Sequence, residues 1–293
     1  MRFVDQVKFG YIRCPSTKAL LKFSKDNKSL INNDVKYFFN SYGAPVLLEN
    51  EKQSYEYLKK SKSMINEYEK ISNNVNNYWK DFKAFLSNDY RSKSSKKALK
   101  KMISNYSVKD LCLNLGGGPS RMNEWITNVN IAQYLNIDVV ADAHNIPYAD
   151  NCVDFIHCEA VFEHLYNPQV AAHEMYRILK DGGKAYVVTP FMQTYHGYPD
   201  HYQNFTISGH KRLFQDAGFK ILESGSCVGP LYSLMNMITA FIKNFFPSPL
   251  NHILRILWAG IEILLRPIDL YLANAKNAYV MSSSTYVVLE KNE

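Results

Sequence analysis

The amino-acid sequence predicts an α/β fold, doubly wound around a parallel sheet, and three observations lead to it. From residue 110 to about residue 223, short apolar strands alternate with helical stretches, which is the pattern of βαβ units. The first strand of this series, residues 110–115, runs directly into Gly116-Gly117-Gly118. Near the end of the chain, residues 284–290 read as a closing strand.

Two segments precede this domain. Residues 1–50 predict a small β-rich module, because short apolar runs at residues 7–12, 29–31, 37–39 and 46–48 alternate with turn residues. Residues 51–108 carry apolar side chains at helical intervals among charges, which predicts a linker of one or two amphipathic helices. The main domain would then span residues 109–293, with a helical insertion at 229–278 before the last strand.

The positive charge of the chain is concentrated in one segment. The formal net charge is +7, and residues 52–101 alone hold thirteen Lys or Arg against five Asp or Glu. Such a segment can attract nucleic acid or an anionic membrane surface. It has no glycine-arginine or aromatic-ladder character, so a solvated helical face is the favoured interpretation and nucleic acid is not an expected partner.

The cysteines predict a reducing compartment. There are five, an odd number, and no two have CxxC spacing, which argues against a disulfide framework and against a complete zinc site. We therefore expect a cytoplasmic protein without a bound metal. The first residues lack the apolar core of a signal peptide, and no stretch of about 18 uncharged apolar residues predicts a membrane span.

The glycine run predicts a ligand site. Consecutive glycines between a strand and a helix let the backbone approach a ligand closely, with helix amides beside it. The run Gly116–Gly118 is followed by Pro119-Ser120-Arg121, so neither the dinucleotide pattern GxGxxG nor the phosphate-loop ending Gly-Lys-Ser/Thr is present.

The motifs that follow the glycines have a specific order. They are Ala141-Asp142-Ala143, Ile146-Pro147-Tyr148, Val153-Asp154-Phe155, Phe162-Glu163-His164 and Arg177-Ile-Leu-Lys-Asp-Gly-Gly183. Over roughly residues 110–228 the chain resembles the type 11 group of class I methyltransferases, which depend on S-adenosyl-L-methionine. The resemblance implies a Rossmann-like, seven-stranded sheet that binds this cofactor at the carboxyl ends of its first strands.

The resemblance also implies which residues form the cofactor site. Leu115, Gly116, Gly117 and Gly118 would line the methionine and ribose, and Asp142 with Ala143 would meet the adenine. Glu159 and Ala160 would close the pocket. Two positions where the family commonly has an acid hold Asn114 and Asn130 instead, and Asn130 stands where a carboxylate usually grips the ribose hydroxyls. An amide brings no charge, and charge-assisted hydrogen bonds are about twice as strong, so a catalytically inactive binding or scaffold protein is the alternative.

The loop after the fifth strand is rich in histidine and tyrosine. Residues 195–202 hold His196, His201 and Tyr202, and similar loops in the resembling family face the transferred methyl group. A hydroxyl nucleophile needs a base tuned near the working pH, for which histidine is suited. We therefore predict transfer to oxygen, with His201 or His196 as the general base. The competing interpretation is that these residues only pack the loop against the sheet.

The N-terminal module resembles the Trm112-like, zinc-ribbon-derived domains that accompany some methyltransferases. The residues that carry this resemblance are Cys14-Pro15 and the run from Tyr42 to Leu48. A metal-binding version needs four thiolates, and here only Cys14 remains, so we expect a metal-free module.

The apolar helices predicted at residues 231–272 leave several uses open. Their apolar arcs are wider than one domain face requires. They could form a lid over the substrate, a homodimer contact, a peripheral contact with the inner face of the membrane, or a buried insertion. Because the loop at 190–206 is aromatic and not rich in Lys or Arg, we predict a small-molecule, glycan or lipid-linked acceptor, and an RNA methyltransferase is the further alternative.

Overall fold

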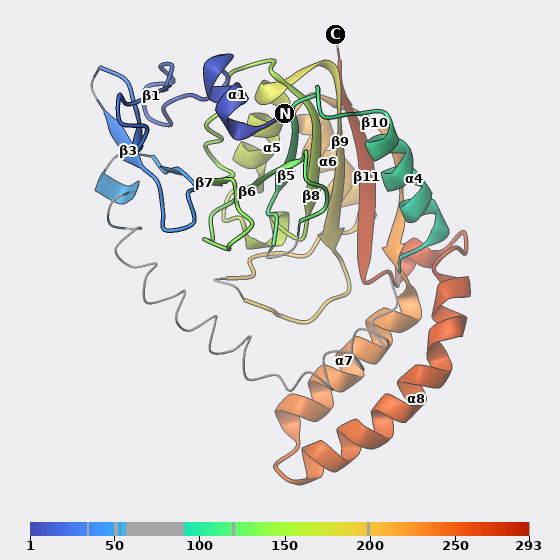
Figure 1. The fold of residues 1–293 in the computed structure, drawn as a ribbon. Helices are drawn as coiled ribbons and strands as arrows, with labels where there is room; N and C mark the ends of the chain where they lie inside the picture. Colours follow the sequence, from blue (N-terminus) through green and yellow to red (C-terminus); the bar gives the residue numbers. More distant parts are fainter. Residues whose placement is uncertain are drawn as a thin grey trace.

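The computed structural model describes residues 1–33, 35–49, 52–54, 56, 91–118, 121–197 and 200–292. The helical prediction for residues 57–90 therefore lies outside the described residues. The described chain is built around one mixed sheet with helices on both faces (Figure 1).

The central sheet has eight strands in the order β10-β11-β9-β8-β5-β6-β7-β4. Strand β11 is antiparallel to both its neighbours, and all other pairs are parallel. The predicted seven-stranded, doubly wound sheet is thereby confirmed, and β4 from the N-terminal segment adds an eighth strand beside β7. The strands are β4 (Val46–Leu47), β5 (Cys112–Leu115), β6 (Thr127–Asn130), β7 (Val139–Ala141), β8 (Val153–Glu159), β9 (Leu179–Pro190), β10 (Phe219–Val228) and β11 (Ser284–Lys291).

Helices cover both faces of the sheet, which is why its inner strands are apolar on both sides. Helices α5 (Pro168–Ile178) and α6 (Ile207–Asp216) pack on one face, where Met175 and Phe214 join a core that includes Leu113. Helix α4 (Lys93–Ser104) packs on the other face, where Ala98 and Met102 meet Phe155. Helix α4 lies within the segment 51–108, for which a helical linker is predicted, and covers the sheet on the α7–α8 side (Figure 1).

The N-terminal segment differs from its prediction at residues 7–12. Helix α1 (Phe3–Lys8) takes up the first two residues of this stretch, a turn follows, and only isolated bridges form at Ile12 and Arg13. The physical reason is a tertiary contact. Gln6 donates to Thr127 Oγ1 at 2.7 Å and accepts from the Tyr148 hydroxyl at 2.9 Å, so burying this side chain holds the helix against the main domain.

The remainder of the segment is β-structured, as predicted. Strands β1 (Lys22–Phe23), β2 (Ser29–Ile31) and β3 (Lys36–Phe38) form a small antiparallel sheet. Its core is continuous with that of the main domain through residues such as Leu21, Leu30 and Tyr37.

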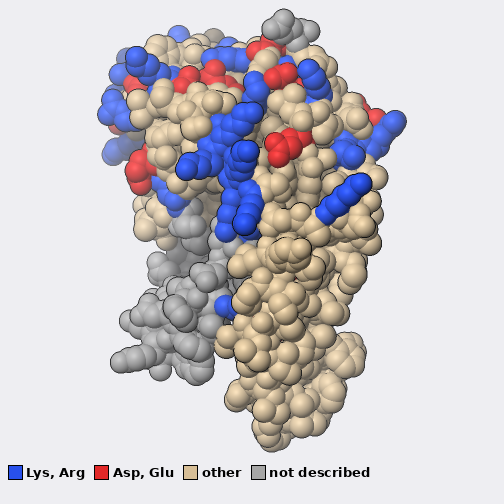
Figure 2. Space-filling view, turned by 90° about the vertical axis from the view of Figure 1, so that its right-hand side faces the viewer, with Lys and Arg blue, Asp and Glu red and all other residues tan. Residues whose placement is uncertain are grey.

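Helices α7 (Pro230–Phe245) and α8 (Leu250–Leu272) form an antiparallel hairpin that projects away from the sheet (Figure 1). Asp269 fixes the base of the hairpin, because its Oδ1 accepts from the backbone N–H groups of Leu231 and Tyr232. Apart from Asp269, no residue of α8 is buried within the described part of the chain. Figure 2 shows Lys and Arg gathered over the main domain, while the face of the projecting hairpin turned to the viewer carries almost no charge. No helix among the described residues has the length and apolar character to cross a membrane.

Candidate functional site

The glycine run leaves β5 in a conformation that only glycine tolerates well. Gly116 has φ of +75°, and a Cβ there would collide with the Val161 side chain. A Cβ on Gly117 would lie 2.8 Å from the Asn128 carboxamide. A Cβ on Gly118, in contrast, would meet nothing within 4 Å among the described residues. The first two glycines are therefore required by the fold, and the third borders open space into which a ligand can approach.

The predicted site residues meet at one edge of the sheet. Leu115, Asn130 and Glu159 end β5, β6 and β8, and Asp142 follows β7 directly. These four strands are adjacent and parallel, so their carboxyl ends lie together. This is the edge at which open α/β sheets bind ligands.

Asn130 holds the glycine run in place. Its Nδ2 donates to the Gly117 carbonyl at 2.8 Å, and its Oδ1 accepts from Ala132 N at 2.9 Å. The amide that replaces the family's usual acid is thus part of the loop's own hydrogen bonding.

Asn114 is one member of a buried polar row across three strands. Its Nδ2 donates to Asn128 Oδ1 at 3.0 Å, and its Oδ1 accepts from His157 Nδ1 at 2.8 Å. Beyond His157, the same strand ends at Glu159. The row runs beneath Gly117, so Asn114 supports the glycine run from inside the sheet.

Glu159 is paired with Arg91, a residue that precedes α4. The guanidinium donates to both carboxylate oxygens, at 2.7 and 2.6 Å. Burial by itself would raise the pKa of Glu159, but the His157 ring and the Arg91 charge outweigh it and lower this pKa. Glu159 is therefore held as a carboxylate. The next residue, Ala160, has φ of +54°, which is a strained conformation for a non-glycine residue and is often found beside ligand sites.

Asp142 keeps one oxygen available. Its Oδ1 accepts from both the backbone N–H and the Nδ1–H of His144, at 2.9 and 2.7 Å. The Asp142 side chain is 43% exposed. Because these bonds use only Oδ1, Oδ2 can accept from a ligand donor such as an exocyclic amine. Ala143 beside it is partly buried against the core.

The loop between β9 and α6 brings three histidines together. Ring centroids of His196 and His201 lie 4.3 Å apart, and the His164 ring is 5.4 Å from that of His196. His201 Nδ1 accepts from His196 N at 3.2 Å, so its other nitrogen donates to Asn204 Oδ1 at 2.9 Å. Tyr202 is anchored by its backbone N–H, which donates to the Glu163 carbonyl at 2.8 Å, and its hydroxyl donates to Asp200.

Glu163 lies beneath this cluster and was not among the predicted site residues. It belongs to the 3-10 helix η1 (Phe162–His164) and is 0% exposed. Burial is the main cause that raises the pKa of Glu163 to about 7. The Glu-His pair was visible in the sequence only as part of the family motif. Its closeness to His196, more than thirty residues later, is a product of the fold.

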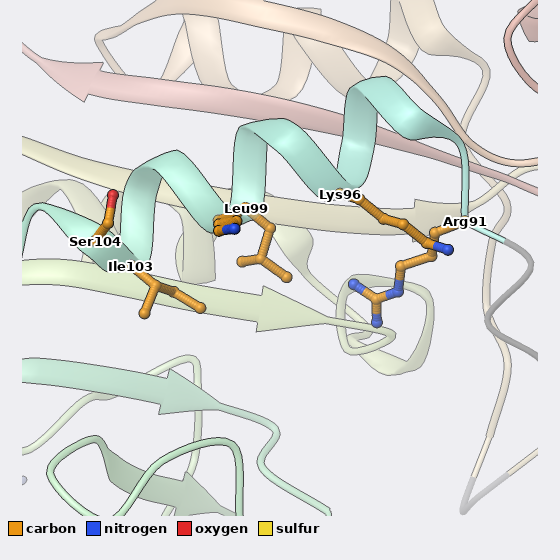
Figure 3. A pocket seen from close by; sticks show the side chains of 6 residues that line it. Arg91, Lys96, Leu99, Ile103 and Ser104 are labelled. Atoms are coloured by element: carbon orange, nitrogen blue, oxygen red, sulfur yellow. The ribbon is translucent and has the colours of Figure 1, made fainter.

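A basic hollow of about 590 Å³ lies along α4, and Figure 3 shows Lys96 reaching toward Arg91. It is lined by Arg91, Lys96, Leu99, Lys100, Ile103 and Ser104. Through Arg91 and its partner Glu159, this hollow borders the predicted cofactor site. The sequence patterns did not identify Arg91 as a site residue, because only tertiary structure brings it to the end of β8.

The described residues fit S-adenosyl-L-methionine in two respects. Gly118 leaves open space beside the glycine run, and Asp142 has a carboxylate oxygen free for the adenine amine. This cofactor supplies an electrophilic methyl group on a sulfonium. The residues at these strand ends can contribute to the chemistry by binding this cofactor.

Residues 113–187 match a family model described as a methyltransferase domain. No curated protein sequence matches the chain.

Similar solved structures include phosphoethanolamine N-methyltransferase 2 of Haemonchus contortus in complex with S-adenosyl-L-methionine. It is 13% identical, with 68% of this chain and 52% of that chain covered and a TM-score of 0.43. The YcgJ protein of Bacillus subtilis is 12% identical, with 68% and 98% covered and a TM-score of 0.39. A structure containing the Trm112 methyltransferase activator of Haloferax volcanii is 16% identical, with 68% and 88% covered and a TM-score of 0.43.

The resemblance of residues 1–50 to Trm112-like modules stays a prediction. The family match, which begins in β5 and ends in β9, covers the glycine run, Asp142, Glu159 and the Glu163-His164 pair. Residues 113–187 of this chain therefore match the family described as a methyltransferase domain.

Proposed function

We propose that this protein transfers the methyl group of S-adenosyl-L-methionine to an oxygen atom of a small-molecule, glycan or lipid-linked acceptor. The observation that carries the proposal is the meeting of Gly116–Gly118, Asp142 and Glu159 at one sheet edge, within the segment that matches the methyltransferase family. Methyl transfer is an in-line displacement, so the enzyme mainly has to align the acceptor oxygen with the sulfonium methyl.

The histidine cluster supports transfer to oxygen. The cluster lies close to the predicted cofactor site, because η1, which contains His164, begins directly after Val161, and Val161 packs against Gly116. Of the two predicted bases, the geometry favours His196 over His201. His196 donates from Nδ1 to the Thr194 carbonyl at 2.9 Å, which leaves a lone pair on Nε2, whereas both nitrogens of His201 already have partners.

The α7–α8 hairpin supports an acceptor with an apolar or membrane-bound part. Large apolar side chains are exposed along both helices, among them Phe241, Phe245, Leu250, Ile253, Ile256, Leu257, Leu264 and Tyr271. Exposed apolar surface of this extent marks an interaction site. We propose that the hairpin contacts the inner face of a membrane peripherally, in a cytoplasmic protein, and thereby gives access to a lipid-linked acceptor. A homodimer through the same surface is the competing use.

An inactive binding protein is the second candidate function. Asn114 and Asn130 favour it, because both amides are engaged within the fold and neither offers a charge to the cofactor.

Calorimetric titration of the full chain separates these candidates. We expect S-adenosyl-L-methionine and its demethylated product to bind, and NAD⁺ not to bind. Absence of heat with both sulfur compounds would refute the methyltransferase proposal. Binding without transfer of a labelled methyl group to any hydroxylated glycan or lipid extract would favour the inactive candidate.

A further inference from the structure

Glu163 is a buried carboxylate without a hydrogen-bond donor. It is 0% exposed, and among the described residues neither Oε1 nor Oε2 has a hydrogen-bond partner. A buried carboxylate in this state is costly unless a cation or a proton compensates it. A bound cation is one way to supply the missing charge in a folded protein.

Two imidazoles face this carboxylate with the same nitrogen. His164 Nε2 and His196 Nε2 each lie 3.7 Å from Glu163 Oε1. A carbonyl oxygen can only accept, so the bonds from His164 Nδ1 to Asp200 O, at 2.6 Å, and from His196 Nδ1 to Thr194 O fix both Nδ1 atoms as donors. In the neutral rings, both Nε2 atoms therefore carry lone pairs that point at the same space as the carboxylate.

This arrangement is that of metal ligands held by outer hydrogen bonds. Histidines that bind metals usually donate their other ring N–H to a carbonyl or carboxylate, which fixes the tautomer and the ring direction. One ligand atom from each of Glu163, His164 and His196 can be chosen so that all lie within 4.8 Å of one another. In a tetrahedral site with bonds of about 2.0–2.2 Å, ligand atoms lie roughly 3.3–3.6 Å apart, a spacing that the two Glu163–histidine distances of 3.7 Å nearly reach.

We propose that Glu163, His164 and His196 bind one divalent transition-metal ion. Two imidazoles and one carboxylate form a donor set that suits Zn²⁺ and its neighbours better than Mg²⁺ or Ca²⁺, which prefer oxygen ligands. Three protein ligands leave a coordination position open. His196 and His164 are partly solvent-accessible, so that position can be reached from outside.

The open position gives the site a use that rests on the proposed function. An acceptor hydroxyl bound there would lose its proton to water more readily, because a metal ion stabilises the oxyanion. The oxygen then forms the new bond to the methyl carbon as the carbon–sulfur bond breaks, and the sulfonium becomes a neutral thioether. Metal and proton compete for His196 Nε2, so with metal bound this residue is a ligand and not the base.

Cysteine spacing by itself predicts no metal centre in this chain. A site made of an adjacent Glu-His pair and a histidine from a distant loop has no regular ligand spacing, such as CxxC, that the sequence would show.

Zn²⁺ titrated into the chelator-treated full chain tests the inference. We expect one Zn²⁺ per chain by calorimetry and by elemental analysis after desalting. Glu163→Gln and His196→Gln should each weaken Zn²⁺ by about 100-fold or more, since even loss of an outer partner costs about 10–100-fold. The matched control is His173→Gln, because His173 also donates Nδ1 to a backbone carbonyl, that of Gln169, but belongs to no such cluster.

A second measurement keeps the test independent of activity. Co²⁺ bound to two imidazoles and a carboxylate gives visible d–d absorption, which should be lost in His196→Gln. His196 lies on an exposed loop, so this variant should fold. Stoichiometry well below one Zn²⁺ per chain, or equal affinity in wild type and His196→Gln, would overturn the inference.

Binding of S-adenosyl-L-methionine, measured on the same metal-free protein, reports separately on the proposed function. If the cofactor binds and Zn²⁺ does not, only the metal site is refuted. If Zn²⁺ binds and the cofactor does not, the metal site stands and its role in methyl transfer is refuted.

Discussion

Arg91 and Glu159 form an ion pair in which Arg91 Nη2 donates to both carboxylate oxygens, and this pair joins the segment before α4 to the carboxyl end of β8. The pair lies at the border between the basic hollow and the predicted cofactor site. Both side chains are about three-quarters shielded from solvent, so their attraction is screened less than that of a surface pair.

Replacing Arg91 should therefore destabilise the fold. We expect Arg91→Gln to lower the free energy of unfolding by about 1–2 kcal/mol, because it leaves Glu159 charged and partly desolvated. Adding Glu159→Gln should recover part of this loss. Arg212→Gln, which breaks the exposed pair with Asp216, is the control and should cost less than about 0.5 kcal/mol. Urea unfolding measures all four proteins, and equal effects of the two Arg variants would contradict the prediction.

The three glycines should separate folding from cofactor binding. A Cβ in Gly118→Ala would meet nothing within 4 Å among the described residues, so the midpoint of thermal unfolding should stay at the wild-type value. If the cofactor lies there, the added methyl should weaken its binding by about 1–3 kcal/mol, or roughly 5- to 150-fold in Kd. Gly116→Ala should instead reduce stability, because of its positive φ and the contact with Val161. Unchanged cofactor affinity in Gly118→Ala would mean that the cofactor does not approach this residue.

Asn130→Asp tests what the amide does. From charge alone, a carboxylate here should tighten the cofactor. The structure predicts the reverse, because Asp would lose the bond to the Gly117 carbonyl and place two oxygens against each other. We expect affinity for S-adenosyl-L-methionine to fall about 3- to 10-fold, the loss of about one hydrogen bond. Asn292→Asp makes the same change at a remote amide that donates to Gly218 O and should have no effect on binding.

His210 should make the protein sensitive to acid. This side chain is 0% exposed, its Nδ1 is 3.0 Å from Thr285 Oγ1, and burial lowers the pKa of His210 from 6.5 to about 3. The unfolded chain therefore binds a proton below about pH 6.5 while the folded chain does not, so stability falls as the pH decreases through this range. The expected loss between pH 8 and pH 5 is about 2 kcal/mol from this residue.

The measurement is urea unfolding at both pH values for wild type and His210→Gln. The variant should lose less stability on acidification, by about the same 2 kcal/mol. His173→Gln removes an exposed histidine and should leave the pH dependence as in wild type. An identical pH dependence in His210→Gln would show that His210 does not contribute.

The hairpin should respond to a charge at its exposed surface. Leu264 in α8 is 75% exposed, so Leu264→Glu should leave the free energy of unfolding within about 0.5 kcal/mol of wild type. The same substitution should reduce co-sedimentation with vesicles of phosphatidylcholine and phosphatidylglycerol. Leu135→Glu, at a leucine that is 72% exposed on the main domain, is the control. Loss of a dimer in Leu264→Glu, without vesicle binding by wild type, would favour the homodimer instead.

The sequence by itself determined the α/β fold, the two-sided burial of the parallel strands and the sheet edge at which the cofactor site is predicted. These follow from local patterns: apolar runs of strand length, glycines after β5 and an acidic residue after β7, all read within a few neighbouring residues. The same is true of β11, whose run of Tyr, Val and Leu has strong strand preference.

Tertiary structure decided what depends on contacts between distant residues. It turned residues 3–8 into a helix through Gln6, added β4 to the sheet and paired Arg91 with Glu159. It also placed His196 beside Glu163, where loop and 3-10 helix meet. Hydrogen bonds and charges act over a few ångströms in space, and no spacing along the chain encodes which distant residues will share that space.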